Sequence, residues 1–209
     1  GFTLIEIVSA VAMVAIFAAA ISAMVFRHLE DAKVGRAQSE TEVIATAVLS
    51  YYKDTGSWPY TNANGPSGNS VNRVISSGDV ATGAGPDADP GAGNWGTYGT
   101  TKMLGDYLYY NNADDNSSAN GNGANQNNQD WPLTGPSAWK GPYVENYELT
   151  DPWGNAYVVN THYLPGGPYN GAVQHKAFVL SAGPNGLWET GFSNGNPEEI
   201  TGDDIGTLI

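Results

Sequence analysis

Few residues of this chain have the types and spacings that enzymes use for catalysis. The segment from Gly191 to Gly195 matches the G-x-S-x-G pattern of hydrolases, in which Ser193 would need a histidine later in the chain. All three histidines come earlier instead: His28, His162 and His175. Paired acids such as Glu198 and Glu199 lie among glycines, whereas glycosidase carboxylates need a rigid scaffold around a bound sugar. We therefore expect a protein that is not an enzyme.

The ionisable residue with the most unusual surroundings is Glu6, which precedes an uncharged run of 20 residues from Ile7 to Phe26. At 1.5 Å per residue such a helix is roughly 30 Å long, the thickness of a bilayer's hydrocarbon core. A carboxylate costs on the order of 2.5–3.5 kcal/mol at the centre of such a helix and less near its end, so we expect Glu6 to have a partner. The plainer alternative is a signal anchor with an acid at its edge.

The residues around this acid, Gly1-Phe2-Thr3-Leu4-Ile5-Glu6, resemble the processing site of type IV pilins and type II secretion pseudopilins. The resemblance implies that a prepilin peptidase cuts after Gly1 and that Phe2 becomes a methylated N-terminus. It also implies that Glu6 neutralises the terminal amine of a neighbouring subunit. The apolar helix would serve first as an inner-membrane anchor and later as the core of a filament.

The helix is expected to continue well beyond the apolar run. Residues 27–53 contain no proline and one glycine, Gly35. Within this half, small and apolar residues recur at spacings of three and four: Val34, Ala37, Thr41, Ile44 or Ala45, Val48 and Tyr52. This stripe predicts a helix face packed against a core. Gly56 and Pro59 should end the helix, and a globular head should begin at about residue 54.

The head, residues 54–209, is expected to be a small antiparallel sheet with long loops. An insertion at about 60–130 is dominated by Gly, Asn, Ser, Pro and Asp, a composition that buries little of itself. Two later segments, Ala156 to Tyr163 and Gln174 to Leu180, are rich in β-branched and aromatic residues and predict a hairpin. The fold class is therefore α+β, with a long helix, membrane-spanning over residues 1–26 and amphipathic over 27–53, packed on the sheet.

The charge of the chain restricts its partners. The formal net charge is −13, and most of it lies in the head. Such a surface disfavours phosphate backbones and anionic lipid heads, so no nucleic-acid partner is expected. It favours divalent cations, and the absence of cysteine means that no disulfide can fix the loops.

A second resemblance, to the major pseudopilin of type II secretion systems, rests on four blocks: Trp139 to Tyr143, Asp151 to Asn155, Leu180 to Gly186, and Gly202 to Ile205. It implies a calcium ion that orders the C-terminal loop, with Asn185, Asp203 and Asp204 as ligands. Their oxygens suit calcium, although the family often has an aspartate where this chain has Asn185. The alternative is a solvated acidic tail.

Together these features predict a structural subunit that polymerises through its N-terminal helix into a type IV pilus-like or type II secretion pseudopilus filament. The subunit would cross the inner membrane once before assembly and then form a periplasmic or extracellular filament at the cell surface. Its partners would be its own copies, prepilin peptidase and the assembly machinery. Two alternatives remain: a surface pilus with adhesive loops, and a membrane-tethered carbohydrate-binding module that uses exposed aromatic residues, namely Trp95, Tyr98, Trp131 and Trp139.

Overall fold

The computed structural model describes residues 1–59, 75–78, 104–111, 131–147, 149–161, 164, 176–190 and 199–209. Its elements follow one another as α1 (Leu4–Thr55), β1 (Ile75–Ser76), α2 (Leu104–Leu108), β2 (Val158–Val159), β3 (Phe178–Ser181) and β4 (Ile205–Leu208). A long helix and a small antiparallel sheet make this an α+β fold, as the sequence predicts. Most of the Gly/Asn-rich insertion, His162, His175 and the Gly191–Gly195 segment lie outside the described residues.

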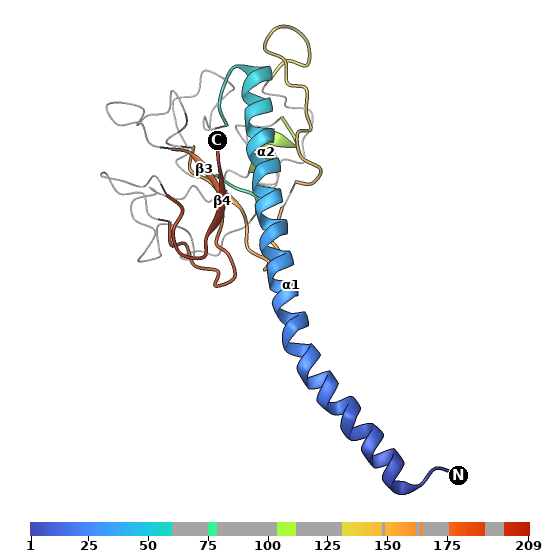
Figure 1. The fold of residues 1–209 in the computed structure, drawn as a ribbon. Helices are drawn as coiled ribbons and strands as arrows, with labels where there is room; N and C mark the ends of the chain where they lie inside the picture. The colour runs from blue at the N-terminus through green and yellow to red at the C-terminus, as the bar shows by residue number, and fades with distance from the viewer. Residues whose placement is uncertain are drawn as a thin grey trace.

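The helix α1 is continuous over 52 residues and passes through Gly35 without interruption. It begins after the N-cap residue Thr3 and ends at Gly56, whose φ of 75° is the left-handed conformation that glycine adopts without strain. The Gly56 amide donates to the carbonyl of Tyr52 at 2.8 Å. The predicted end near residue 53 is therefore confirmed to within two residues. Figure 1 shows that the second half of α1 lies along the head, whereas the first half extends away from it.

The sheet has four strands in the order β1-β2-β3-β4, and every neighbouring pair is antiparallel. Val158 pairs with Leu180 and Val159 with Val179, which confirms the predicted antiparallel pairing of these two segments, although the strands are shorter than expected. The strands β1 and β4 were not predicted from the sequence. In β4, Ile205 pairs with Ser181 and Leu208 with Phe178, so the C-terminal segment forms an edge of the sheet.

The second half of α1 packs on β3 and β4. Its buried residues are Ala37, Thr41, Ile44, Ala45, Ala47, Val48, Tyr51 and Thr55. The prediction is wrong at both ends of the stripe, since Val34 is 41% exposed and Tyr52 is 40% exposed. The buried face of the helix begins only at Ala37, and Tyr51 continues it one turn beyond Val48. Tyr52 instead stacks on Trp58 with ring centroids 3.9 Å apart.

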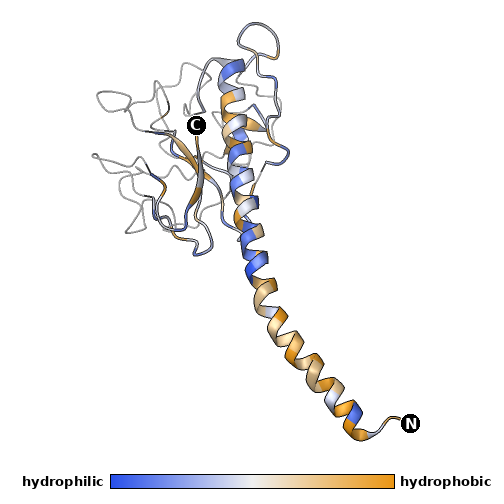
Figure 2. Ribbon diagram, in the orientation of Figure 1, coloured by the Kyte–Doolittle hydropathy of each residue, from blue (hydrophilic) through white to orange (hydrophobic). Residues whose placement is uncertain are grey.

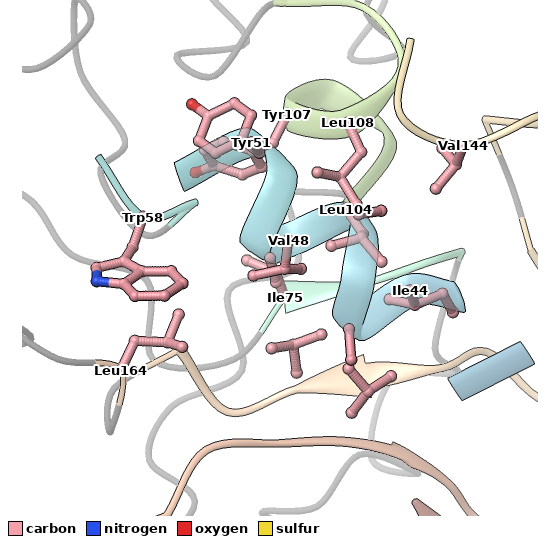
Figure 3. Packing of buried hydrophobic residues seen from close by; sticks show 14 of the residues in the cluster. Ile44, Val48, Tyr51, Trp58, Ile75, Leu104, Tyr107, Leu108, Val144 and Leu164 are labelled. Carbon is pink, nitrogen blue, oxygen red and sulfur yellow. The ribbon is translucent and has the colours of Figure 1, made fainter. Parts of the chain in front are cut away.

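The core between helix and head is largely aromatic and aliphatic (Figure 3). Tyr51 lies at its upper end and makes edge-to-face contacts with Tyr107, Trp131 and Tyr143 at centroid distances of 6.1, 6.4 and 6.0 Å. The indole Nε1 of Trp131 donates to the Tyr51 hydroxyl at 2.8 Å. These contacts hold α2 and the segments around Trp131 and Tyr143 against the last turns of α1.

Candidate functional site

The N-terminus of α1 is closed by a capping box between Thr3 and Glu6. Glu6 Oε2 accepts hydrogen bonds from the Thr3 amide and from Thr3 Oγ1, each at 2.8 Å, and the Glu6 amide donates to Thr3 Oγ1 at 3.4 Å. This arrangement satisfies amides that would otherwise lack a partner and places an acid at the positive end of the helix. The T-x-x-E spacing is a recognised sequence signature of such a cap.

Glu6 thus has polar partners in its own chain but no ion-pair partner among the residues that the structure describes. Both of its side-chain hydrogen bonds end on Oε2. The carboxylate remains exposed at the tip of α1, so a cationic group from outside the chain can reach it.

Apart from a few polar residues such as Glu6, the first half of α1 is hydrophobic along its length (Figure 2). Its exposed large apolar residues are Phe2, Leu4, Ile5, Ile7, Val8, Val11, Met13, Val14, Ile16, Phe17, Ile21, Met24, Val25, Phe26 and Leu29. A helix that is apolar all round is stable only when lipid or other protein covers it. By length and composition it could be a single membrane span, and a signal sequence near the N-terminus would have the same properties.

A second candidate site lies beside the sheet, where three acids come together: Glu189, Asp203 and Asp204. Asp204 Oδ2 accepts hydrogen bonds from the amides of Glu189 and Thr190 at 3.0 and 2.6 Å. Glu189 Oε2 in turn accepts from the Asp203 amide at 2.9 Å. These contacts cross-link the segment after β3 to the segment before β4.

The structure brings the three predicted ligands into this one region. The Asn185 amide donates to Asp203 Oδ2 at 3.0 Å, across 18 residues of sequence. The Asn185 side chain is engaged locally, because Oδ1 accepts from the Leu187 amide at 2.6 Å and Nδ2 donates to Glu189 Oε2 at 3.2 Å. Glu189 was not predicted from the sequence. The only signal for it was that an acid lies between two of the blocks named above, Leu180 to Gly186 and Gly202 to Ile205.

Burial distinguishes Asp204 from the other two acids of this cluster, which are partly exposed. Asp204 is 8% exposed, so this segment is not a solvated tail, and burial raises the pKa of its carboxyl to about 6. Burial and the neighbouring Glu189 carboxylate raise the pKa of Asp203, whereas the hydrogen bond from the Asp203 amide lowers the pKa of Glu189. Oδ1 of Asp203 and Oδ1 of Asp204 are both buried, and neither has a hydrogen-bond partner within the described part of the chain.

These observations suit a hard divalent cation. Calcium binds six to eight oxygens, and carboxylates are its commonest charged ligands. Two buried carboxylate oxygens without partners and three adjacent acids are the donor set that such an ion would use. The remaining oxygens of the two aspartates are occupied by hydrogen bonds. In this arrangement, the described His, Cys, Asp and Glu side chains include no group of three that could hold a metal ion. Binding would therefore require some of these hydrogen bonds to rearrange.

Residues Asp151 to Asn155 form a turn that supports this region. Asp151 is buried, and its Oδ1 accepts from the amides of Trp153 and Asn155 at 3.0 and 2.7 Å. Its Oδ2 accepts from Ser181 Oγ at 2.6 Å, and Ser181 Oγ accepts from the Gly183 amide at 3.1 Å. The turn thereby fixes the end of β3, from which the chain enters the acid cluster.

Of the four aromatic residues considered for carbohydrate binding, the structure describes two, and both make contacts within the head or with α1. Trp131 was expected to be exposed, which is wrong: it is 4% exposed and bonded to Tyr51. Trp139 is half-buried, and its Nε1 donates to the Tyr107 carbonyl at 3.1 Å. Trp95 and Tyr98 lie outside the described residues.

Comparison of this chain with protein-family models, with curated proteins and with solved structures found no match in any of the three.

Proposed function

We propose that this chain is a structural subunit that polymerises through α1 into a filament of the type IV pilus or type II secretion pseudopilus kind. The observation that carries the proposal is the exposed apolar half of α1, which ends in an acid without a cationic partner in the described residues. An apolar helix drawn out of lipid must bury its surface elsewhere, and the same surface on other copies is chemically equivalent. Packing of these helices around a common axis yields a helical homo-oligomer.

Glu6 would determine the register of this packing. In the low dielectric of a helix bundle an unpaired charge is costly, so each Glu6 must meet a positive group. The terminal amine of a neighbouring subunit, created at Phe2 when prepilin peptidase removes Gly1, is the group that we propose. The capping contact with Thr3 keeps the Glu6 carboxylate at the helix tip, where a neighbour's N-terminus can reach it.

The test compares Glu6→Gln with the unaltered chain in cells that contain the peptidase and the assembly machinery. Glutamine preserves the capping box, since Gln also serves at this position, but it removes the charge. Leaving the partner's amine unpaired should cost about 3–5 kcal/mol per contact, and we expect most filaments to be lost. The yield is measured by electron microscopy of sheared material in which mass spectrometry identifies this chain.

A matched control is Glu42→Gln, which removes one charge from an exposed position on the same helix. It should leave filament yield unchanged, and both variants should retain the thermal stability of the head. Normal filament yield from Glu6→Gln would count against the mechanism. Filaments that occur mainly on the cell surface would favour a pilus, with adhesion as an added role, whereas restriction to the periplasm would favour a secretion pseudopilus.

We further propose that calcium orders the C-terminal loop of the head, with Asp203, Asp204 and Asn185 in its site. The buried, unpartnered oxygens of the two aspartates support this assignment. The ion would cross-link the segments after β3 and before β4, a role that disulfides play in other exported proteins. Limited proteolysis of the full chain in calcium and in EDTA tests it: cleavage in this loop should be faster in EDTA, and equal rates would refute a structural calcium.

A further inference from the structure

We infer that Glu189 is a further ligand of this calcium site and supplies the negative charge that Asn185 lacks, while Asn185 acts as a positioning residue. The inference rests on the calcium site of the proposed function and concerns which residues of this chain form it.

The first observation is the placement of the Glu189 carboxylate. Its Oε2 accepts from the Asp203 amide at 2.9 Å and from Asn185 Nδ2 at 3.2 Å, so the partly exposed side chain is directed toward the cluster. The adjacent backbone amides of Glu189 and Thr190 hold Asp204 Oδ2. One short segment thus contributes a carboxylate and also orients the neighbouring one.

The second observation is the fit of the backbone at Gly202 around this carboxylate. A Cβ atom built on Gly202 would lie 1.9 Å from Glu189 Oε2 and 2.3 Å from its carboxyl carbon. Gly202 also has a φ of 70°, which disfavours any side chain there. Only glycine leaves room for the Glu189 carboxylate at this point, so its position is built into the loop.

The third observation is independent of hydrogen bonding within the cluster. Asp204 is more than nine-tenths buried, and its Oδ1 has no partner in the described residues, as is also true of Asp203 Oδ1. Burying such oxygens next to a third carboxylate is unfavourable without a cation. A divalent ion placed among the three acids would satisfy both oxygens and offset the repulsion with Glu189.

The role of Asn185 follows from its own contacts. Its side-chain oxygen is occupied by the Leu187 amide at 2.6 Å, while its Nδ2 donates to Glu189 Oε2. In this arrangement its amide group holds Glu189 in place. An aspartate at 185 would lose the donor and add a fourth charge, so asparagine at 185 and glutamate at 189 complement each other.

Calorimetric titration of CaCl₂ into the full chain in detergent micelles tests the inference. Glu189→Gln should weaken calcium affinity about tenfold or more, because ligand charge determines the affinity of calcium sites. Glu199→Gln, an exposed acid in the same C-terminal segment, is the charge-matched control and should bind as the unaltered chain does.

A second pair of variants checks the site through the backbone. Gly202→Ala and Gly135→Ala both place a side chain at positive φ, but a Cβ at Gly135 meets no atom within 4 Å. Only Gly202→Ala should weaken calcium binding beyond the shared loss of stability. If the unaltered chain binds calcium and Glu189→Gln binds it equally well, the inference is overturned while the calcium site stands. If the unaltered chain binds no calcium, the site itself is refuted, and the filament proposal is still judged separately by Glu6→Gln.

Discussion

The hydroxyl of Thr207 on β4 lies 2.8 Å from the hydroxyl of Thr41 on α1, across 166 residues of sequence. Gln38 Nε2 donates to the same Thr207 hydroxyl at 3.2 Å. The last strand is therefore attached directly to the buried face of the long helix. Since Asp203 and Asp204 immediately precede β4, order in the acid cluster is coupled to the packing of the head on α1.

Replacing Thr207 with valine should weaken this attachment. Valine preserves the shape and strand preference of threonine but removes the hydroxyl that contacts Thr41 and Gln38. At about 1 kcal/mol for each hydrogen bond, the free energy of unfolding should fall by about 1–2 kcal/mol. Chemical denaturation of the full chain in detergent measures it, and Thr207→Ser, which keeps the hydroxyl, should lose less. Equal stability of Thr207→Val and the unaltered chain would show that these contacts contribute nothing.

Asn111 should be sensitive for two separate reasons. Its Nδ2 donates to the Trp131 carbonyl at 2.9 Å, its Oδ1 accepts from the Trp131 amide at 3.1 Å, and its φ is 54°. Asn111→Ala loses both bonds and strains the left-handed backbone, so we expect a loss of about 2–4 kcal/mol in unfolding free energy. Asn111→Gly also loses both bonds, but glycine adopts this positive φ without strain. It should therefore be about 1 kcal/mol more stable than the alanine variant. If the two variants are equally stable, the backbone conformation is not a source of the effect.

Without calcium, Asp204 should make stability depend on pH. Its pKa is raised from 3.8 to about 6 in the folded chain, so the native state binds this proton more tightly than the unfolded state. The contribution of Asp204 to stability is therefore favourable at low pH and is lost as the pH rises from about 4 to about 6. Glu189, whose pKa is lowered, acts in the opposite direction, so the effect of Asp204 must be isolated.

The isolating variant is Asp204→Asn, which cannot titrate. The melting temperatures of the unaltered chain and of Asp204→Asn are compared in EDTA from pH 4 to pH 7. As the pH rises, the melting temperature of the unaltered chain should fall relative to that of the variant. Added calcium should reverse this trend, because the ion binds the ionised carboxylate and competes with the proton. A difference that is constant with pH in EDTA would contradict the raised pKa.

Local patterns in the sequence determined α1 almost completely. Three local features predict it: proline is absent between Thr3 and Gly56, an apolar run begins the helix, and turn residues follow its end. Each acts over a few residues at a time, so its effect can be inferred without knowing the fold. The same holds for the pairing of β2 with β3, because their β-branched residues and the turn between them are close in the chain. The location of Asp203 and Asp204 could also be anticipated, but only through a family resemblance.

Tertiary structure decided the features that depend on distant contacts. The burial of Tyr51 in place of Tyr52 follows from where the head meets the helix, and the burial of Trp131 follows from its contact with Tyr51. Strand β4 forms because β3 and α1 offer it a paired edge and a packing face. Glu189 joins the acid cluster because Gly202, 13 positions later, leaves space for its carboxylate. Residue types alone carry no such distances, since the chain must first fold to bring these groups together.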